Sequence, residues 1–170
     1  MAKSIPGSVR LVTGLQAVFL AASSGQGTIE GATDVFLGDV DPKFKAQRVF
    51  RPPVPTNRSR LSVLELVTDG TLRQIFSNLD PGLTKICLTE DQIIRVCRAR
   101  SDCLRLHQKM TFFPFLDGDG KFTVAAVTVM ENGLLAVQKY DASRGPDSDD
   151  DLMYATAKHR VIVPTPVLVH

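Results

Sequence analysis

The chain has 170 residues, of which 44% are hydrophobic and 22% are charged, and its formal net charge at pH 7 is +2. Such a length and composition are typical of one folded globular domain with a sizeable core. The small net charge requires neither a nucleic acid nor an acidic partner, and no apolar run approaches the ~20 residues that a membrane helix needs.

Cysteine usage indicates a reducing compartment. The chain contains three cysteines, Cys87, Cys97 and Cys103. An odd count without dense spacing argues against a secreted disulfide framework, so we expect reduced thiols and a cytoplasmic protein.

The N-terminal region admits two interpretations. Lys3 and Arg10 precede a moderately apolar run over 11–22, which has some features of a secretory signal. Thr13, Gly14 and Gln16 interrupt this run, so an ordinary structural element is favoured. The pattern fits either a helix or two short strands over 8–22.

Residues 23–34 (SSGQGTIEGATD) are predicted by their composition to form a flexible loop. Two short strands are then predicted over 34–37 and 43–50, with a turn between them. The run Arg51-Pro52-Pro53-Val54-Pro55 predicts an extended connector over 51–59, because proline fixes its own φ and restricts the residue before it.

Two helices are predicted in the middle of the chain, after residues 60–67, which fit a helix or a strand. The first helix covers 71–79, because four apolar residues share one face at i, i+3, i+4 and i+7. The second covers 89–104. Thr89 and Gln92 have capping-box spacing at its start, and Glu90 and Asp91 favour the positive end of the helix dipole.

Residues 111–141 predict three consecutive antiparallel strands. Asp117-Gly118-Asp119-Gly120 and Glu131-Asn132-Gly133 separate three apolar runs, and Asp-Gly and Asn-Gly supply the positive φ that tight hairpin turns need. Pro114 lacks an amide donor, which predicts an edge or bulged first strand. The second strand is predicted to be central, with four buried side chains: Phe122, Val124, Val127 and Val129.

A polar, acidic loop over 142–151 and a last strand over 158–163 complete the chain. We therefore expect a single α+β domain over 1–170. Its core is an antiparallel sheet, a C-terminal meander of three to four strands, packed against two or three short helices.

The segments CLTEDQII (87–94), TFFPF (111–115) and HRVIVP (159–164) together resemble a pattern in small uncharacterised bacterial proteins. The resemblance covers the C-terminal half of the chain. It implies no activity and no site.

A basic stretch over 43–60 is the first candidate binding site. It holds eight basic or aromatic residues and no acidic one: Lys43, Phe44, Lys45, Arg48, Phe50, Arg51, Arg58 and Arg60. Cations beside an exposed Phe could hold phosphates while the ring stacks on a base. In the alternative interpretation the Phe rings enter the core and the cations form a solvated rim.

The acidic residues Asp147, Asp149, Asp150 and Asp151 form the second candidate site. We expect this single-signed segment and the basic stretch to attract each other, within a chain or between chains. The alternative is that both are independent solvated surfaces. Asp117 and Asp119 are explained by turn chemistry and lack the further ligands of a calcium loop.

Arginines on the second helix have acidic partners at helical spacing. Asp91 with Arg95 and Arg98 with Asp102 are both i,i+4 pairs, which indicates a charge-balanced solvent face. Arg100, which lies close to the apolar arc, is the exception.

Zinc or thiol chemistry is not favoured. Cys97, Cys103 and His107 are potential ligands, and Cys87 or His159 would have to supply a fourth. Six residues along a helix separate Cys97 from Cys103 by about 120° around the axis. No local signature of a nucleophilic Cys surrounds them. We expect buried reduced thiols, no metal and no cofactor.

No constellation in the sequence meets the requirements of catalysis. The favoured function is a non-enzymatic binding or assembly module, with a protein partner or self-association and no membrane. The alternatives are a nucleic-acid-binding protein that uses 43–60 and an enzyme of unrecognised type.

Overall fold

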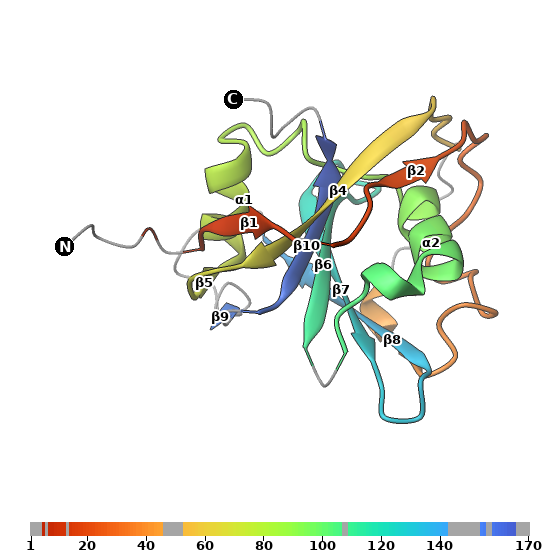
Figure 1. Ribbon diagram of the computed structural model, residues 1–170. Helices are drawn as coiled ribbons and strands as arrows, with labels where there is room; N and C mark the ends of the chain where they lie inside the picture. The colour runs from red at the N-terminus through yellow and green to blue at the C-terminus, as the bar shows by residue number, and fades with distance from the viewer. Residues whose placement is uncertain are drawn as a thin grey trace.

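A mixed β-sheet organises the molecule. The computed structural model describes residues 5, 7–12, 14–45, 53–106, 109–142, 154–155 and 158–165. Within them, an 8-stranded sheet has the strand order β1-β4-β10-β6-β7-β8-β3, and β2 also pairs with β4 (Figure 1). The bounds are β1 (Val9–Leu11), β2 (Val18–Leu20), β3 (Asp39–Val40), β4 (Ser59–Leu66), β6 (Met110–Leu116), β7 (Phe122–Val129), β8 (Leu135–Asp141) and β10 (Arg160–Pro164).

Smaller elements surround this sheet. A 2-stranded sheet joins β5 (Gly70–Thr71) to β9 (Tyr154–Ala155). The helices in the described residues are α1 (Leu72–Leu79), α2 (Glu90–Ala99) and two 3-10 helices, η1 (Pro42–Phe44) and η2 (Ser101–Cys103). None of these helices is long and apolar enough to cross a membrane.

The α+β class is confirmed, but the expectation of an antiparallel sheet of three to four strands is wrong. The meander β6–β7–β8 is antiparallel, as predicted. On its two sides, however, β10 pairs with β6 and β3 pairs with β8 in parallel. Parallel pairing joins strands through long connections, and the pattern within one strand carries no information about its neighbour's direction.

The two hairpins of the meander form as predicted. Gly120 and Gly133 have φ of +75° and +81°. The Asp117 side chain also accepts the amides of Asp119 and Lys121 at 2.9 and 3.0 Å, which accounts for the acidic residue at this turn. Asp117 therefore serves the turn, as an Asx-type cap.

Each face of the sheet carries its own core. On β4, Leu61 and Val63 pack with α2 in one core, whereas Leu64 and Leu66 pack with α1 in the other. This follows from the alternation of side chains along a strand. Phe122, Val124 and Val127 on β7 are buried as predicted, and Val129 is partly buried.

Both helices start at a capping box. Thr89 with Gln92 begins α2, as the sequence predicts, and Thr71 with Gln74 begins α1 in the same way. Helix α2 ends at Ala99, so the predicted end at 104 is wrong. Arg100 leaves the helical region, with φ −131° and ψ 48°, and the 3-10 helix η2 follows.

Several N-terminal predictions need correction. The strands expected over 34–37 and 43–50 are absent from the described residues there: 34–37 holds turns and coil, η1 occupies 42–44, and the strand in this region is β3. Residues 46–50 lie outside the described residues. Two short strands, β1 and β2, occupy the region 8–22, and 60–67 belongs to β4.

The edge position predicted from Pro114 is also wrong. Strand β6 lies between β10 and β7. Its pairing with β10 involves Thr111 and Phe112, at the other end of the strand from the proline. Pro114 has no amide to donate, but its carbonyl oxygen accepts a hydrogen bond from the amide of Leu88 at 2.8 Å.

Candidate binding site

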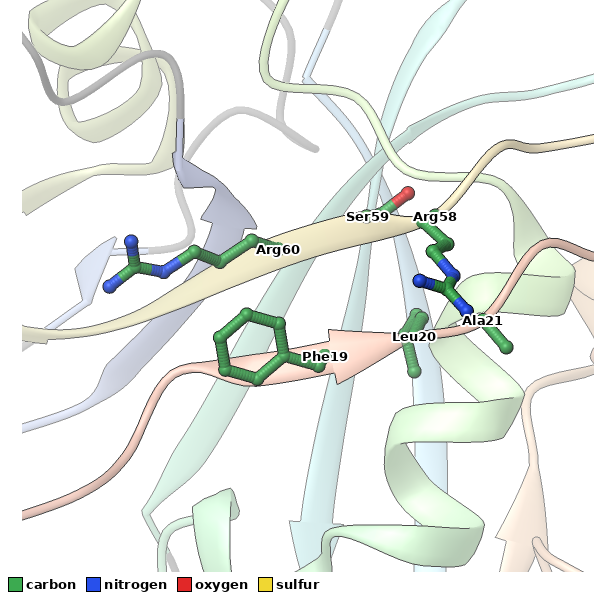
Figure 2. Close-up of a pocket in the computed structure, with 6 residues that line it drawn as sticks. All are labelled: Phe19, Leu20, Ala21, Arg58, Ser59 and Arg60. Carbon is green, nitrogen blue, oxygen red and sulfur yellow. The ribbon is translucent and has the colours of Figure 1, made fainter.

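An open pocket of about 440 Å³ lies where β2 pairs with the start of β4. Six residues line it, three from each segment: Phe19, Leu20, Ala21, Arg58, Ser59 and Arg60. Figure 2 shows the Phe19 ring and the two arginine side chains on this part of the sheet. Two of these residues, Arg58 and Arg60, belong to the basic stretch that the sequence singles out.

Strand alternation turns Phe19 outward. Val18 and Leu20 are buried in the core beneath α2, so the side chain between them must leave the opposite face. The Phe19 side chain is 71% exposed, the most of any large hydrophobic residue described. A large ring in this position contributes little to the core and is available for contact.

A cation lies beside this ring. Phe19 and Arg60 are direct partners in the antiparallel register of β2 and β4. The Arg60 guanidinium carbon is 5.7 Å from the centre of the Phe19 ring, within the range of a cation–π contact. Arg58 precedes Arg60 by two residues and extends beside Leu20 and Ala21 (Figure 2).

Arg58 and Arg60 differ from the other arginines that the structure describes. Neither forms an ion pair or hydrogen bond with another described residue. The remaining described arginines bond to carboxylates or backbone carbonyls: Arg10, Arg73, Arg95, Arg98, Arg100, Arg105 and Arg160. The positive charge of the pocket therefore has no internal counter-charge among the described residues.

Hydrogen bonds from α2 and from the residue after it fix the backbone around the pocket. Arg95 Nη1 of α2 donates to the Ala21 carbonyl at 2.9 Å, and Nη1 of Arg100, which follows the helix, donates to the Ala17 carbonyl at 3.5 Å. Gln92 Nε2 donates to the Ser59 hydroxyl at 3.0 Å, and this hydroxyl donates to the Asn57 carbonyl. The polar atoms of the frame are thus engaged, while Phe19, Arg58 and Arg60 face outward.

The described part of the basic stretch does not form one surface. Lys43, within η1, and Lys45, just after it, are exposed near β3 at one edge of the sheet, whereas Arg58 and Arg60 lie toward the other edge. Phe44 is buried, stacks on Phe115 with ring centres 6.3 Å apart, and is covered by Lys139. Its ring cannot stack on a base, so the core interpretation holds for Phe44.

The other candidate residues lie outside the described residues. They are Arg48, Phe50 and Arg51 of the basic stretch and the whole acidic group Asp147, Asp149, Asp150 and Asp151. The attraction between the two stretches stays a prediction.

The arginines of α2 are paired, but in part with unexpected residues. Arg95 lies 3.9 Å from Asp91, as the helical spacing predicts. Arg98 instead forms a bidentate pair with Asp34 at 2.8 Å, because α2 ends before Asp102. Asp102 pairs with Arg100, and this hydrogen bond holds the pKa of the Asp102 carboxyl below its usual range.

The three thiols have different surroundings: Cys97 is buried, Cys87 donates to the Leu83 carbonyl, and Cys103 lies beside the Asp102 carboxylate. Cys87, Cys97 and Cys103 are free, and burial raises the pKa of the Cys97 thiol to about 12, so it is protonated at neutral pH. His107 lies outside the described residues. Within the described ranges, no group of three or more His, Cys, Asp or Glu side chains is placed to hold a metal ion.

Sequence reasoning missed Phe19. The signal was the alternation in Val18-Phe19-Leu20, but a three-residue strand is too short to separate from a helical pattern.

Comparison with known proteins found no matching family model, no matching curated protein and no matching solved structure.

Proposed function

We propose that this protein is a non-enzymatic binding module that holds an anionic partner at the pocket of Phe19, Arg58 and Arg60. One observation carries the proposal: two arginines without a described counter-charge share a pocket with the most exposed aromatic ring of the described residues, and one of them, Arg60, contacts that ring. The arginines have no counter-charge among the described residues, whereas an anion with an apolar portion would engage both the cations and the ring.

The lining of the pocket favours binding over catalysis. Its described residues include no His, Cys, Asp or Glu to transfer a proton or attack a substrate. The single hydroxyl, that of Ser59, has a glutamine as one partner and a backbone carbonyl as the other, and neither can serve as a general base. Arginine stays charged and holds anions.

Retention on a heparin column, eluted with a salt gradient, tests this function. Arg58→Gln with Arg60→Gln should elute at markedly lower salt than the wild type. The matched control is Arg98→Gln with Arg10→Gln, which removes the same charge from arginines that have carboxylate partners. If both pairs lower the elution salt equally, the binding follows net charge, and the pocket is not the site.

A second candidate function, self-association, is favoured by the open edge of the sheet. Within the described residues, the short strands β1 and β2 pair only with β4. Leu11 and Phe19 on these strands are 61% and 71% exposed. An edge with exposed apolar side chains is a template for pairing with another chain.

Sedimentation velocity over a range of concentrations tests this second function. A self-associating protein should show a mass that rises with concentration, and Leu11→Ser with Phe19→Ser should abolish the rise. A constant monomer mass for the wild type would reject self-association and leave the anionic partner as the function of this edge.

A further inference from the structure

We infer that the anionic partner is a single-stranded nucleic acid, with a base stacked on Phe19 and the adjoining phosphates held by Arg58 and Arg60. This inference rests on the proposed function and specifies its partner. It requires a flat, exposed ring, cations in the same pocket, and a backbone that keeps the two in place. The pocket supplies all three.

The ring is suited to stacking because most of its surface is exposed. Phe19 is 71% exposed, and the Arg60 guanidinium lies over the ring with its carbon 5.7 Å from the ring centre, so a base would stack on the ring surface that Arg60 leaves open. Every base has a π-face, so stacking on an aromatic side chain recognises bases without regard to sequence. A sugar sulfate offers no comparable flat group, and an acidic peptide offers one only where it carries an aromatic side chain.

Both arginines line the same pocket as the ring. Arg58 and Arg60 are two residues apart, so their Cα atoms are ~6.8 Å apart in extended backbone. Their side chains diverge, with that of Arg60 near Phe19 and that of Arg58 beside Leu20 and Ala21 (Figure 2). Arg60 lies directly opposite Phe19 in the strand register. A polymer that stacks one base on the ring thus carries its phosphates past cations rather than past carboxylates.

The pocket is preorganised, since its backbone is tied to α2. The Ala21 carbonyl and the Ser59 hydroxyl, one on each side of the pocket, accept hydrogen bonds from Arg95 and Gln92 of that helix. A fixed frame lowers the entropy lost when a ligand binds. The single strand is favoured over a duplex, because the bases of a duplex are already stacked on one another and cannot reach Phe19.

Fluorescence anisotropy with two labelled oligomers tests the inference. One is a short oligothymidylate, and the other has the same number of phosphates but lacks bases. The wild type should bind the oligothymidylate more tightly. Phe19→Leu should weaken that binding roughly fivefold to 100-fold and abolish the preference for bases, whereas Phe19→Tyr, which keeps a stacking ring, should bind like the wild type.

The salt dependence tests the arginines separately. For single strands each phosphate contact contributes about 0.7 to the slope of log affinity against log salt. Arg58→Gln and Arg60→Gln should each make the slope less steep by about this amount. Arg98→Gln, which removes an exposed charge paired with Asp34, is the control and should leave the slope nearly unchanged.

Equal binding of the two oligomers by the wild type, or an unchanged preference for bases in Phe19→Leu, would overturn the inference. The protein would then be a general polyanion binder, and the heparin result would still support the proposed function. Tighter binding of the same sequence as a duplex would overturn it as well. Loss of pocket-dependent heparin retention would reject both proposals together.

Discussion

The backbone amide of Met110 donates a hydrogen bond to Nδ1 of His159 at 2.9 Å. The contact requires a lone pair on that nitrogen, so it holds the imidazole in its neutral form. The ring is buried and stacks on Phe112, with ring centres 5.4 Å apart. Burial, together with the nearby Lys109, lowers the pKa of His159 below its ordinary value.

This histidine predicts acid sensitivity. Because its pKa is lower in the folded state, the unfolded chain binds the proton first as the pH falls, and stability is lost below the unfolded value of about 6.5. The free energy of unfolding should therefore decline from about pH 7 downward until the folded group also titrates. Asn at this position offers an acceptor oxygen without titrating.

Chemical denaturation of wild type and His159→Asn across this pH range measures the effect. The difference in stability between the two proteins should shrink as the pH falls, because only the wild type loses the histidine contribution. Parallel pH profiles would show that His159 does not titrate differently in the two states.

Phe122→Ala should strongly destabilise the fold. Phe122 is buried on β7 and meets Phe76 of α1 edge-on at 5.5 Å. Truncating a buried Phe lowers the free energy of unfolding by ~3–5 kcal/mol. The control is the same substitution at exposed Phe19, which should change stability by less than ~0.5 kcal/mol. Urea denaturation compares them, and a midpoint unchanged in Phe122→Ala would contradict the central position of β7.

Glu65→Gln should cost more stability than removal of an exposed acid. Glu65, whose side chain is 17% exposed, lies 3.1 Å from Arg10 and 3.8 Å from Arg105, and Arg160 is its partner on β10. Without the carboxylate, Arg10 and Arg105 lose the counter-charge that they share. We expect a loss of about 1–3 kcal/mol.

Asp34→Asn is the control for Glu65→Gln, because its pair with Arg98 is exposed on both sides and is worth about 0–1 kcal/mol. Denaturation at low and high salt compares the two variants. Equal losses would show that the arginines around Glu65 are solvated well enough to need no counter-charge.

The acidic segment should act through its charge. Replacing Asp149, Asp150 and Asp151 with Asn should change the thermal stability or the mass of the protein at low salt, if these residues attract the basic stretch. The change should vanish near 1 M salt, where the Debye length is ~3 Å. Identical behaviour of both proteins in both buffers would end the charge-pairing hypothesis.

Local signals were enough to predict the meander and the start of α2. Gly120 and Gly133 are needed at positions of positive φ, and Thr89 with Gln92 satisfies the first amides of the helix. These features depend on residues close together in sequence. Their physical cause is therefore visible in the chain itself.

The candidate binding site could not be predicted, because it depends on contacts between residues that are far apart in the sequence. Phe44 stands between two lysines and looks like an exposed basic–aromatic group, yet it packs on Phe115 of β6, 71 residues further along the chain. Phe19 carries no flanking charge, and its cation comes from β4 across the sheet. Both outcomes follow from long-range packing, which overrides local composition.

A hydrophobic core covers each face of the sheet, and the pocket beside β2 and β4 is a small part of the surface. The small size of the pocket limits the affinity of a single contact. The pocket is lined by 6 residues, against roughly 20–30 residues on each side of a standard protein interface. If the proposed partner binds there, a single encounter would be short-lived. A polymer of repeating units would rebind the same pocket before diffusing away, and several copies of the protein along one strand would prolong the attachment by avidity.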